Sequence, residues 1–164
     1  MTGTGITHDS FTIERRLAAC PAHVWAAWSD PDLKRRWFVD SDGPDWQTAE
    51  YSVDFRVGGG ETGRFVLSSG PGAGEHANVT HYLDIVPRTR IVFAYTMALD
   101  GRIHSASLAT VRLEESGGGT ILTFTEQGAY FAPSDGATGR RAGWEALLTA
   151  LERILKTTTR SAAE

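Results

Sequence analysis

The sequence predicts an α+β domain in which a curved antiparallel sheet wraps around one long C-terminal helix. The first observation is the segment 139–158, where apolar residues recur at helical spacing along one stripe. The second is the region 51–126, where short apolar runs alternate with turns that contain Gly or Pro. An isolated helix of this kind is marginally stable, so we expect the sheet to cover its stripe. The stripe consists of Trp144, Leu147, Leu148, Leu151 and Leu155, and the predicted polar face carries Arg140, Arg141, Glu145, Glu152, Arg153 and Lys156.

Length and composition limit the classes of protein to which the chain can belong. Its 164 residues with 41% hydrophobic content suit one domain, since a chain of this length buries roughly 70% of its unfolded surface. The net charge of -4 and the lack of basic runs argue against nucleic acid and membranes as partners. No apolar run approaches the ~20 residues of a membrane span, and the first residues lack a signal-peptide pattern. The single Cys20 cannot form an internal disulfide, which predicts a cytoplasmic location.

The elements that precede the main run of strands can be assigned in order. Residues 1–10 are rich in Gly and Thr and predict a flexible tail, and residues 11–17 alternate as a first strand. A short helix then begins at Pro21, because the missing N–H of proline costs nothing at a first helical position. Asp30 is the expected N-cap of a second short helix that begins at Pro31 and ends near Trp37. Residues 39–49 are rich in Asp, Gly and Pro and predict a loop.

The remaining strands are predicted to form a meander. Turns built on Gly or Pro separate them, and connections this short favour antiparallel neighbours over parallel crossovers. The domain is expected to span residues 11–158, with residues 159–164 as a C-terminal tail. The predicted strands are residues 51–57, 63–68, 78–86, 91–97, 102–113 and 120–126.

Several short motifs resemble one protein family in their order and spacing. They are Phe11-Thr12-Ile13, Pro21-x-x-Val24-Trp25-x-Ala27-Trp28-x-Asp30-Pro31, Arg36-Trp37, Phe55-x-Val57-Gly58-Gly59, Tyr82-Leu83-x-Ile85-Val86-Pro87, Arg90-Ile91-Val92-Phe93, Thr120-x-Leu122-Thr123-Phe124-Thr125-Glu126-Gln127-Gly128 and Gly143-Trp144. Over residues 11–156 the chain is similar to the activator of heat-shock protein 90 ATPase homologues, within the SRPBCC (START / Bet v 1-like) superfamily. The resemblance implies a helix-grip fold: a seven-stranded antiparallel sheet curled around the C-terminal helix, two short helices at one end, and a cavity between sheet and helix.

The strand faces indicate which side chains would line this cavity. His81, Tyr95 and Glu126 would be polar groups in an otherwise apolar pocket, which is the usual arrangement of a small-molecule site. Alternatively, His81 and Glu126 occupy strand ends or satisfied hydrogen bonds, and a register slip of one residue would exchange the two faces. The faces predicted to point inward are Val79, His81, Leu83 and Ile85, then Ile91, Phe93, Tyr95 and Met97, then Leu122, Phe124 and Glu126. The predicted cavity residues are Trp37, Phe38, Phe65, His81, Leu83, Phe93, Tyr95, Met97, Phe124, Glu126, Tyr130, Phe131, Trp144 and Leu148.

Aromatic residues near the predicted loops have two interpretations. Trp37 and Phe38, with Trp46 in the following loop, could close the cavity mouth as a lid. Tyr130 and Phe131, expected in the loop before the long helix, could do the same. Alternatively, these aromatic side chains fill the hydrophobic core, which is the commoner role of aromatic residues near helix ends.

Candidate catalytic groups are few. A Glu126 carboxyl in an apolar pocket could act as an acid or base, with His81, His104 or Tyr95 as its partner. His76 and His81 are five residues apart and would face opposite sides of a strand, so we expect no metal site. We also expect no cofactor, because the sequence contains no Walker loop, dinucleotide fingerprint or Gly-x-Ser-x-Gly motif.

These observations lead to three functional hypotheses. The first, which requires least of the sequence, is a module that binds a hydrophobic small molecule, lipid- or polyketide-like, in the cavity. The second is an enzyme of the cyclase, aromatase or hydrolase type that uses the pocket carboxylate with a histidine or tyrosine. The third is a co-chaperone that stimulates a heat-shock protein ATPase, as the family name suggests, although we expect this one-domain chain to lack the additional chaperone-binding domain of the larger eukaryotic activator. A homodimer is a further expectation from the resemblance, because relatives often form one.

Overall fold

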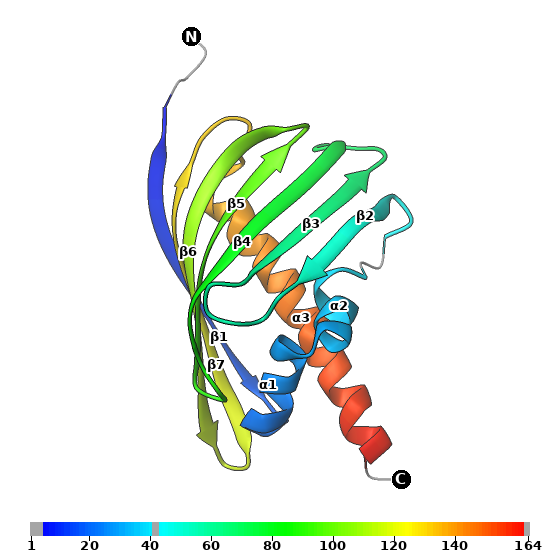
Figure 1. Ribbon diagram of the computed structural model, residues 1–164, viewed down its shortest axis with the longest axis vertical. Coiled ribbons are helices and arrows are strands. Elements are labelled where there is room, and N and C mark those ends of the chain that lie inside the picture. The colour runs from blue at the N-terminus through cyan, green and yellow to red at the C-terminus, as the bar shows by residue number, and fades with distance from the viewer. Residues whose placement is uncertain (1–4, 41–42, 163–164) are drawn as a thin grey trace.

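The computed structural model describes residues 5–40 and 43–162. Within these residues one strand is followed by two short helices, six strands and a long helix, as predicted (Figure 1). The ends of the predicted tails, residues 1–4 and 163–164, lie outside the described residues. The elements are β1 Thr7–Leu17, α1 Pro21–Ser29, α2 Pro31–Phe38, β2 Trp46–Val53, β3 Gly60–Leu67, β4 Gly74–Val86, β5 Arg90–Leu99, β6 Arg102–Ser116, β7 Gly119–Tyr130 and α3 Gly136–Ala162.

The strands form one antiparallel sheet with the order β1-β7-β6-β5-β4-β3-β2. Strands β2 to β7 pair with their neighbours in the chain, and β1 pairs with β7. The sheet curves around α3, and α1 and α2 lie at one end of the sheet beside α3 (Figure 1). This arrangement is the helix-grip fold, so the predicted fold class is confirmed.

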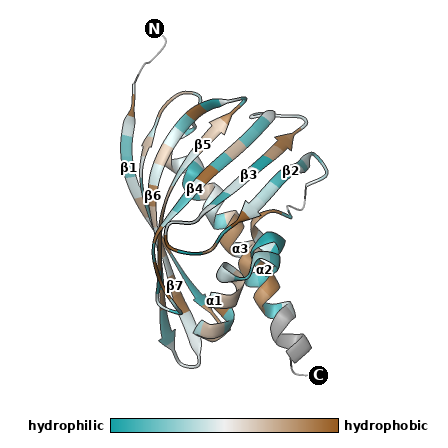
Figure 2. Ribbon diagram, in the orientation of Figure 1, coloured by the Kyte–Doolittle hydropathy of each residue, from teal (hydrophilic) through white to brown (hydrophobic). Residues whose placement is uncertain are grey.

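Alternation along the strands places apolar side chains on the concave face. In β5, Ile91, Phe93 and Tyr95 are buried, and in β7 Phe124 and Glu126 are buried, as the alternation of these two strands predicts. Hydrophilic and hydrophobic positions accordingly alternate along the ribbons of the sheet (Figure 2). The concave face is therefore the side of the sheet that packs against α3.

The two short helices are fixed by a cap and by tryptophan packing. Asp30 Oδ1 accepts the backbone N–H groups of Asp32 at 2.9 Å and Leu33 at 3.2 Å, which confirms the predicted cap of α2. Trp37 packs edge to face on Trp28, with ring centroids 4.7 Å apart, and its Nε1 donates to the Ala27 carbonyl at 2.8 Å. Trp37 is only 2% exposed, so its ring is part of the core that joins α1 to α2.

The long helix contributes one apolar stripe to the core. Trp144, Leu148, Leu151 and Leu155 are buried, and Leu147 is half-buried at the edge of the same stripe. Burial of each such side chain contributes roughly 1.5–3 kcal/mol, as an upper bound, because the unfolded chain already hides some apolar area. Among the described residues, neither α3 nor any other helix is long and apolar enough to cross a membrane.

Several element boundaries differ from the sequence prediction. β1 begins at Thr7 rather than residue 11, β2 begins at Trp46 within the predicted loop, and β7 continues to Tyr130. α3 begins at Gly136 and continues to Ala162, into the predicted C-terminal tail. The apolar pattern marks buried side chains only, whereas ladder hydrogen bonds continue the strands through exposed residues.

Candidate functional site

A cavity of about 1480 Å³ lies between the concave face of the sheet and α3. Its walls come from β2 to β6, from α2 and from α3, and much of the lining is aromatic. This volume exceeds the roughly 300–1,000 Å³ of most small-molecule pockets, so a multi-ring compound would fit. The predicted cavity residues that the structure places along it are Trp37, Phe38, Phe65, Phe93, Tyr95, Met97 and Trp144.

β4 presents to the cavity the face opposite to the predicted one. His81 and Leu83 are exposed, Leu83 by 52%, so the placement of both in the cavity was wrong. A one-residue shift in strand facing exchanges the two faces, and here the inward residues are mostly polar, which disguised them. A bulge between Tyr82 and Asp84 then returns Ile85 to the core, where it packs as predicted. The residues of β4 that line the cavity are His76, Asn78, Thr80 and Tyr82.

A second group of predicted cavity residues lies behind the cavity wall. Phe124 and Leu148 are fully buried in the core, and Glu126 is fully buried beside them. Tyr130 is the last residue of β7 and is 2% exposed, so it is neither in a loop nor part of a lid. Phe131 follows it and is half-buried, with its backbone N–H bonded to the His104 carbonyl at 2.9 Å. These residues support the wall and do not form its surface.

Glu126 is the centre of a closed hydrogen-bond cluster. Its Oε2 accepts from Tyr130 Oη at 2.7 Å, Ser107 Oγ at 3.0 Å and Arg140 Nη1 at 3.3 Å. Its Oε1 accepts from Trp144 Nε1 at 3.2 Å and from the Tyr95 hydroxyl. Both carboxylate oxygens are therefore engaged, in a side chain that is 0% exposed.

Arg140 supplies the positive charge of this cluster. The helical pattern predicted Arg140 on the water-facing side of α3, but its side chain is only 12% exposed and turns toward the sheet. Nη2 donates to Ser105 Oγ at 2.6 Å, Nη1 donates to Tyr95 Oη at 3.0 Å, and the guanidinium lies over the Tyr95 and Tyr130 rings. Burial disfavours the charged guanidinium, but Tyr95 and Glu126 outweigh that effect and raise the pKa of Arg140. The prediction failed because periodicity cannot identify an inward charge that has a buried partner.

Of the candidate partners of Glu126, only Tyr95 contacts it. Burial raises the pKa of the Tyr95 hydroxyl, and Glu126 adds to this effect while Arg140 opposes it. His104 lines the cavity, but its Nδ1 is buried without a hydrogen-bond partner among the described residues. Burial and then Arg140 lower the pKa of His104. Within the described part of the chain, no three His, Cys, Asp or Glu side chains gather as a metal site.

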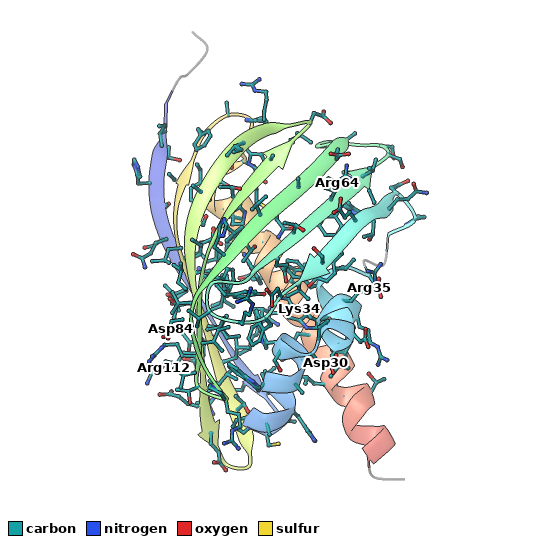
Figure 3. All side chains as sticks on the ribbon, in the orientation of Figure 1. Asp30, Lys34, Arg35, Arg64, Asp84 and Arg112 are labelled. Carbon is teal, nitrogen blue, oxygen red and sulfur yellow. The ribbon has the colours of Figure 1, made fainter. Side chains whose placement is uncertain are left out.

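A second buried charge cluster, which the sequence analysis did not identify, lies on the β3 side of the cavity. Lys34 Nζ of α2 is 3.0 Å from Glu61 Oε2 of β3, and the two side chains are only 4% and 3% exposed. Tyr51 Oη donates to the same Oε2 at 2.9 Å and Tyr82 Oη at 3.4 Å. Lys34 lies between α2 and the sheet, whereas its neighbour Arg35 lies on the outer side of α2 (Figure 3).

Aromatic rings surround the Lys34 ammonium. Nζ lies 4.6 Å from the centroid of the Phe38 ring, 5.0 Å from Trp28 and 5.4 Å from Trp37. Such contacts stabilise a cation away from water. A signal was present in the sequence, since Lys34, Trp37 and Phe38 stand three and four residues apart and share one helix face. A charged residue on a helix is normally solvated, so this spacing alone does not predict that Lys34 is buried.

Aromatic side chains join the two clusters across the cavity wall. Phe93 lies 6.1 Å from Tyr82 and 5.8 Å from Tyr95, measured between ring centroids. Trp144 lies 6.4 Å from Phe93 and 6.2 Å from Phe38. The cavity therefore has an aromatic middle between two buried ion pairs, and this arrangement can receive a flat apolar molecule with few polar groups.

Comparison with known proteins places the chain in a family. Residues 18–156 match the family described as activator of Hsp90 ATPase homolog 1-like protein. The chain belongs to this family. The match covers most of the domain, including the elements that form the cavity, and it confirms the resemblance found in the sequence motifs.

Solved structures show the same fold. A protein of Rhizobium loti is 47% identical, with 91% of this chain and 98% of that chain covered and a TM-score of 0.78. A protein of Rhizobium leguminosarum is 39% identical, with 93% and 97% covered and a TM-score of 0.82. The solution structure of an AHSA1-like protein from Aeromonas hydrophila, at 24% identity, with 92% and 94% covered and a TM-score of 0.65, shows likeness in fold alone. No curated protein matches the chain.

Proposed function

We propose that the chain binds a hydrophobic small molecule, lipid- or polyketide-like, in the cavity between the sheet and α3. The observation that carries this proposal is the cavity itself, with its volume of about 1480 Å³ and its aromatic lining. Largely apolar, concave sites with a few placed polar groups are the usual small-molecule sites of proteins. The fold of this family is commonly a ligand-binding fold.

The two buried ion pairs beside the cavity support an apolar ligand without a net charge. Lys34 is paired with Glu61, and Arg140 is paired with Glu126, so each of these buried cations already has a buried carboxylate. A charged ligand would have to lose its hydration and would find no unpaired opposite charge in either cluster. An uncharged ring system loses little hydration and gains contact with Phe93 and the other rings.

The catalytic alternative has less support from the geometry. Glu126 accepts hydrogen bonds on both oxygens and is paired with Arg140, so neither oxygen is free to act on a ligand. A general acid or base needs access to the reacting atom, and Glu126 lies behind the cavity wall. The cavity therefore favours binding over acid–base chemistry at this carboxylate.

Native mass spectrometry of gently purified protein, followed by solvent extraction, tests the proposal. Gly143 lines the cavity, and a Cβ at this position would have nothing within 4 Å, so Gly143→Trp should narrow the cavity beside Trp144 without a backbone clash. Gly143→Ala is the matched control. We expect a stoichiometric apolar compound on the wild type and on Gly143→Ala, and its loss from Gly143→Trp. An empty wild-type protein whose melting temperature also ignores a panel of lipids and aromatic polyketides would contradict the proposal.

A further inference from the structure

We infer that Glu61 is the polar recognition point of the cavity and that the ligand carries a hydrogen-bond donor, an N–H or O–H group, directed at it. This inference rests on the proposed binding function and specifies the chemistry of the ligand. It follows from the difference between the two carboxylate oxygens of Glu61, because only one of them accepts hydrogen bonds from the described residues of the protein. The residues that carry it are Lys34, Tyr51, Glu61, Tyr82 and Phe93.

The hydrogen bonds of Glu61 are one-sided. Lys34 Nζ at 3.0 Å, Tyr51 Oη at 2.9 Å and Tyr82 Oη at 3.4 Å all approach Oε2. No described residue donates a hydrogen bond to the other oxygen, Oε1, although the Glu61 side chain is only 3% exposed. Oε1 is not closed off by the protein, so it is the oxygen of Glu61 that stays accessible at the cavity.

The free oxygen belongs to a side chain of the cavity lining. Glu61, Lys34 and Tyr82 all line the cavity, and the rings of Phe38 and Phe93 line it beside them. A flat ligand in contact with these rings would have its edge within reach of Glu61. The ion pair with Lys34 and the two tyrosine hydrogen bonds on Oε2 fix the orientation of the carboxylate, so the site is already formed before the ligand binds.

Glu126 provides the internal contrast. Both of its oxygens are engaged, and it does not contribute to the cavity lining. Of the two buried carboxylates, only Glu61 therefore presents an open oxygen to the cavity. Lys34 is already paired with Glu61, and its ammonium lies against three rings, which leaves the carboxylate as the acceptor offered to a ligand.

Two ring compounds of matched shape test this inference. Carbazole has an N–H group where fluorene has a CH2 group, and both have three fused rings. Their affinities for the wild-type protein would be measured by equilibrium dialysis. We expect carbazole to bind at least about tenfold more tightly, since a hydrogen bond to a buried charged acceptor discriminates strongly against an analogue that lacks the donor.

Variants then assign the preference to Glu61. In Glu61→Gln the three donors should hold the amide oxygen in the place of Oε2, so that the amide NH2 replaces the acceptor in the cavity. The preference for carbazole should then fall below about twofold. His81→Ala, on the outer face of β4, is the control and should keep the wild-type preference. If Glu61→Gln fails to fold, the double variant Lys34→Met/Glu61→Gln takes its place, because it also removes the unpaired cation. The comparison of carbazole with fluorene on the wild-type protein does not depend on any variant.

The outcomes separate the two proposals. Equal affinities of carbazole and fluorene for the wild type, or an unchanged preference in Glu61→Gln, would overturn the role of Glu61 and leave apolar binding in place. Binding of neither compound, in a protein that also carries no extractable molecule, would overturn the binding function itself. Tighter binding of fluorene than of carbazole would show that no acceptor faces the ligand.

Discussion

The two buried ion pairs of this protein resemble each other in composition and differ in completeness. Each joins a carboxylate in the sheet to a cation on a helix, and each adds two tyrosine hydroxyls, from Tyr95 and Tyr130 in one cluster and from Tyr51 and Tyr82 in the other. The Glu126 cluster satisfies both carboxylate oxygens and lies behind the cavity wall. The Glu61 cluster satisfies one oxygen and lines the cavity. The difference indicates that the first cluster stabilises the fold and that the second is available to a ligand.

The largest expected effect concerns the closed cluster. Glu126→Leu leaves the guanidinium of Arg140 buried without its carboxylate, and breaking a buried pair in this way costs about 3–5 kcal/mol of unfolding free energy. Urea denaturation followed by tryptophan fluorescence would measure the loss. Glu126→Gln keeps the shape of the side chain and should lose less unfolding free energy than Glu126→Leu. A loss below about 1 kcal/mol for Glu126→Leu would mean that the cluster is not a stabilising unit.

A smaller effect is expected for the open cluster. Lys34→Met should cost about 1.5–3 kcal/mol of unfolding free energy, because Glu61 keeps its two tyrosine donors and contacts the cavity. The double variant Lys34→Met/Glu61→Leu should recover most of this loss, since no unpaired charge remains. The same denaturation experiment measures both variants. A loss for Lys34→Met as large as that for Glu126→Leu would remove the distinction between the clusters.

A matched pair of tyrosine substitutions sharpens the comparison. The Tyr95 hydroxyl donates to Glu126 and accepts from Arg140 and from Trp144, each at 3.0 Å, so Tyr95→Phe should cost about 1.5–3 kcal/mol. Tyr82 makes one hydrogen bond of 3.4 Å to Glu61, so Tyr82→Phe should cost about 0.5–1 kcal/mol. Equal losses in urea denaturation, or a larger loss for Tyr82→Phe, would contradict this order.

A further expected effect is a dependence of stability on alkaline pH. Burial, followed by the neighbouring carboxylate, raises the pKa values of Tyr51 and Tyr82 above the ordinary value of 10.0, and burial also raises that of Tyr95. Above pH 10 the unfolded chain releases these protons while the folded chain keeps them, so stability is full below pH 10 and declines as the pH rises beyond it. Unfolding midpoints at pH 9 and pH 11 would show the decline. Tyr95→Phe and Tyr82→Phe should each reduce it, and an unchanged slope in both would contradict the assignment.

Part of this site could be predicted from the sequence, and the reason is visible in the strands. In β5 and β7 the inward positions are apolar around Tyr95 and Glu126, so the alternation indicated the correct face. In β4 the inward positions include Asn78 and Thr80, whereas apolar Leu83 lies on the outer face, so the same rule selected the wrong one. Apolar patterning identifies a core and fails where the fold buries polar groups for a site.

The two cations were missed for a related reason. Lys34 and Arg140 are charged residues on amphipathic helices, and a charge on a helix is normally solvated. Their burial depends on carboxylates of distant strands, 27 residues away for Lys34 and Glu61 and 14 for Arg140 and Glu126 by residue number. One helix or strand alone does not contain this information. The fold was predictable because it depends on apolar spacing and turn residues, whereas the clusters depend on tertiary pairing.

A crystal structure of the wild-type protein with carbazole would test the central claim most directly. We predict that the three rings lie against Phe93 and Trp144, with the carbazole nitrogen within about 3.2 Å of Glu61 Oε1. The Glu126 cluster should keep its hydrogen bonds unchanged. Carbazole bound outside the cavity, or with its nitrogen directed at the Glu126 cluster instead of Glu61, would contradict the distinction between an open and a closed carboxylate.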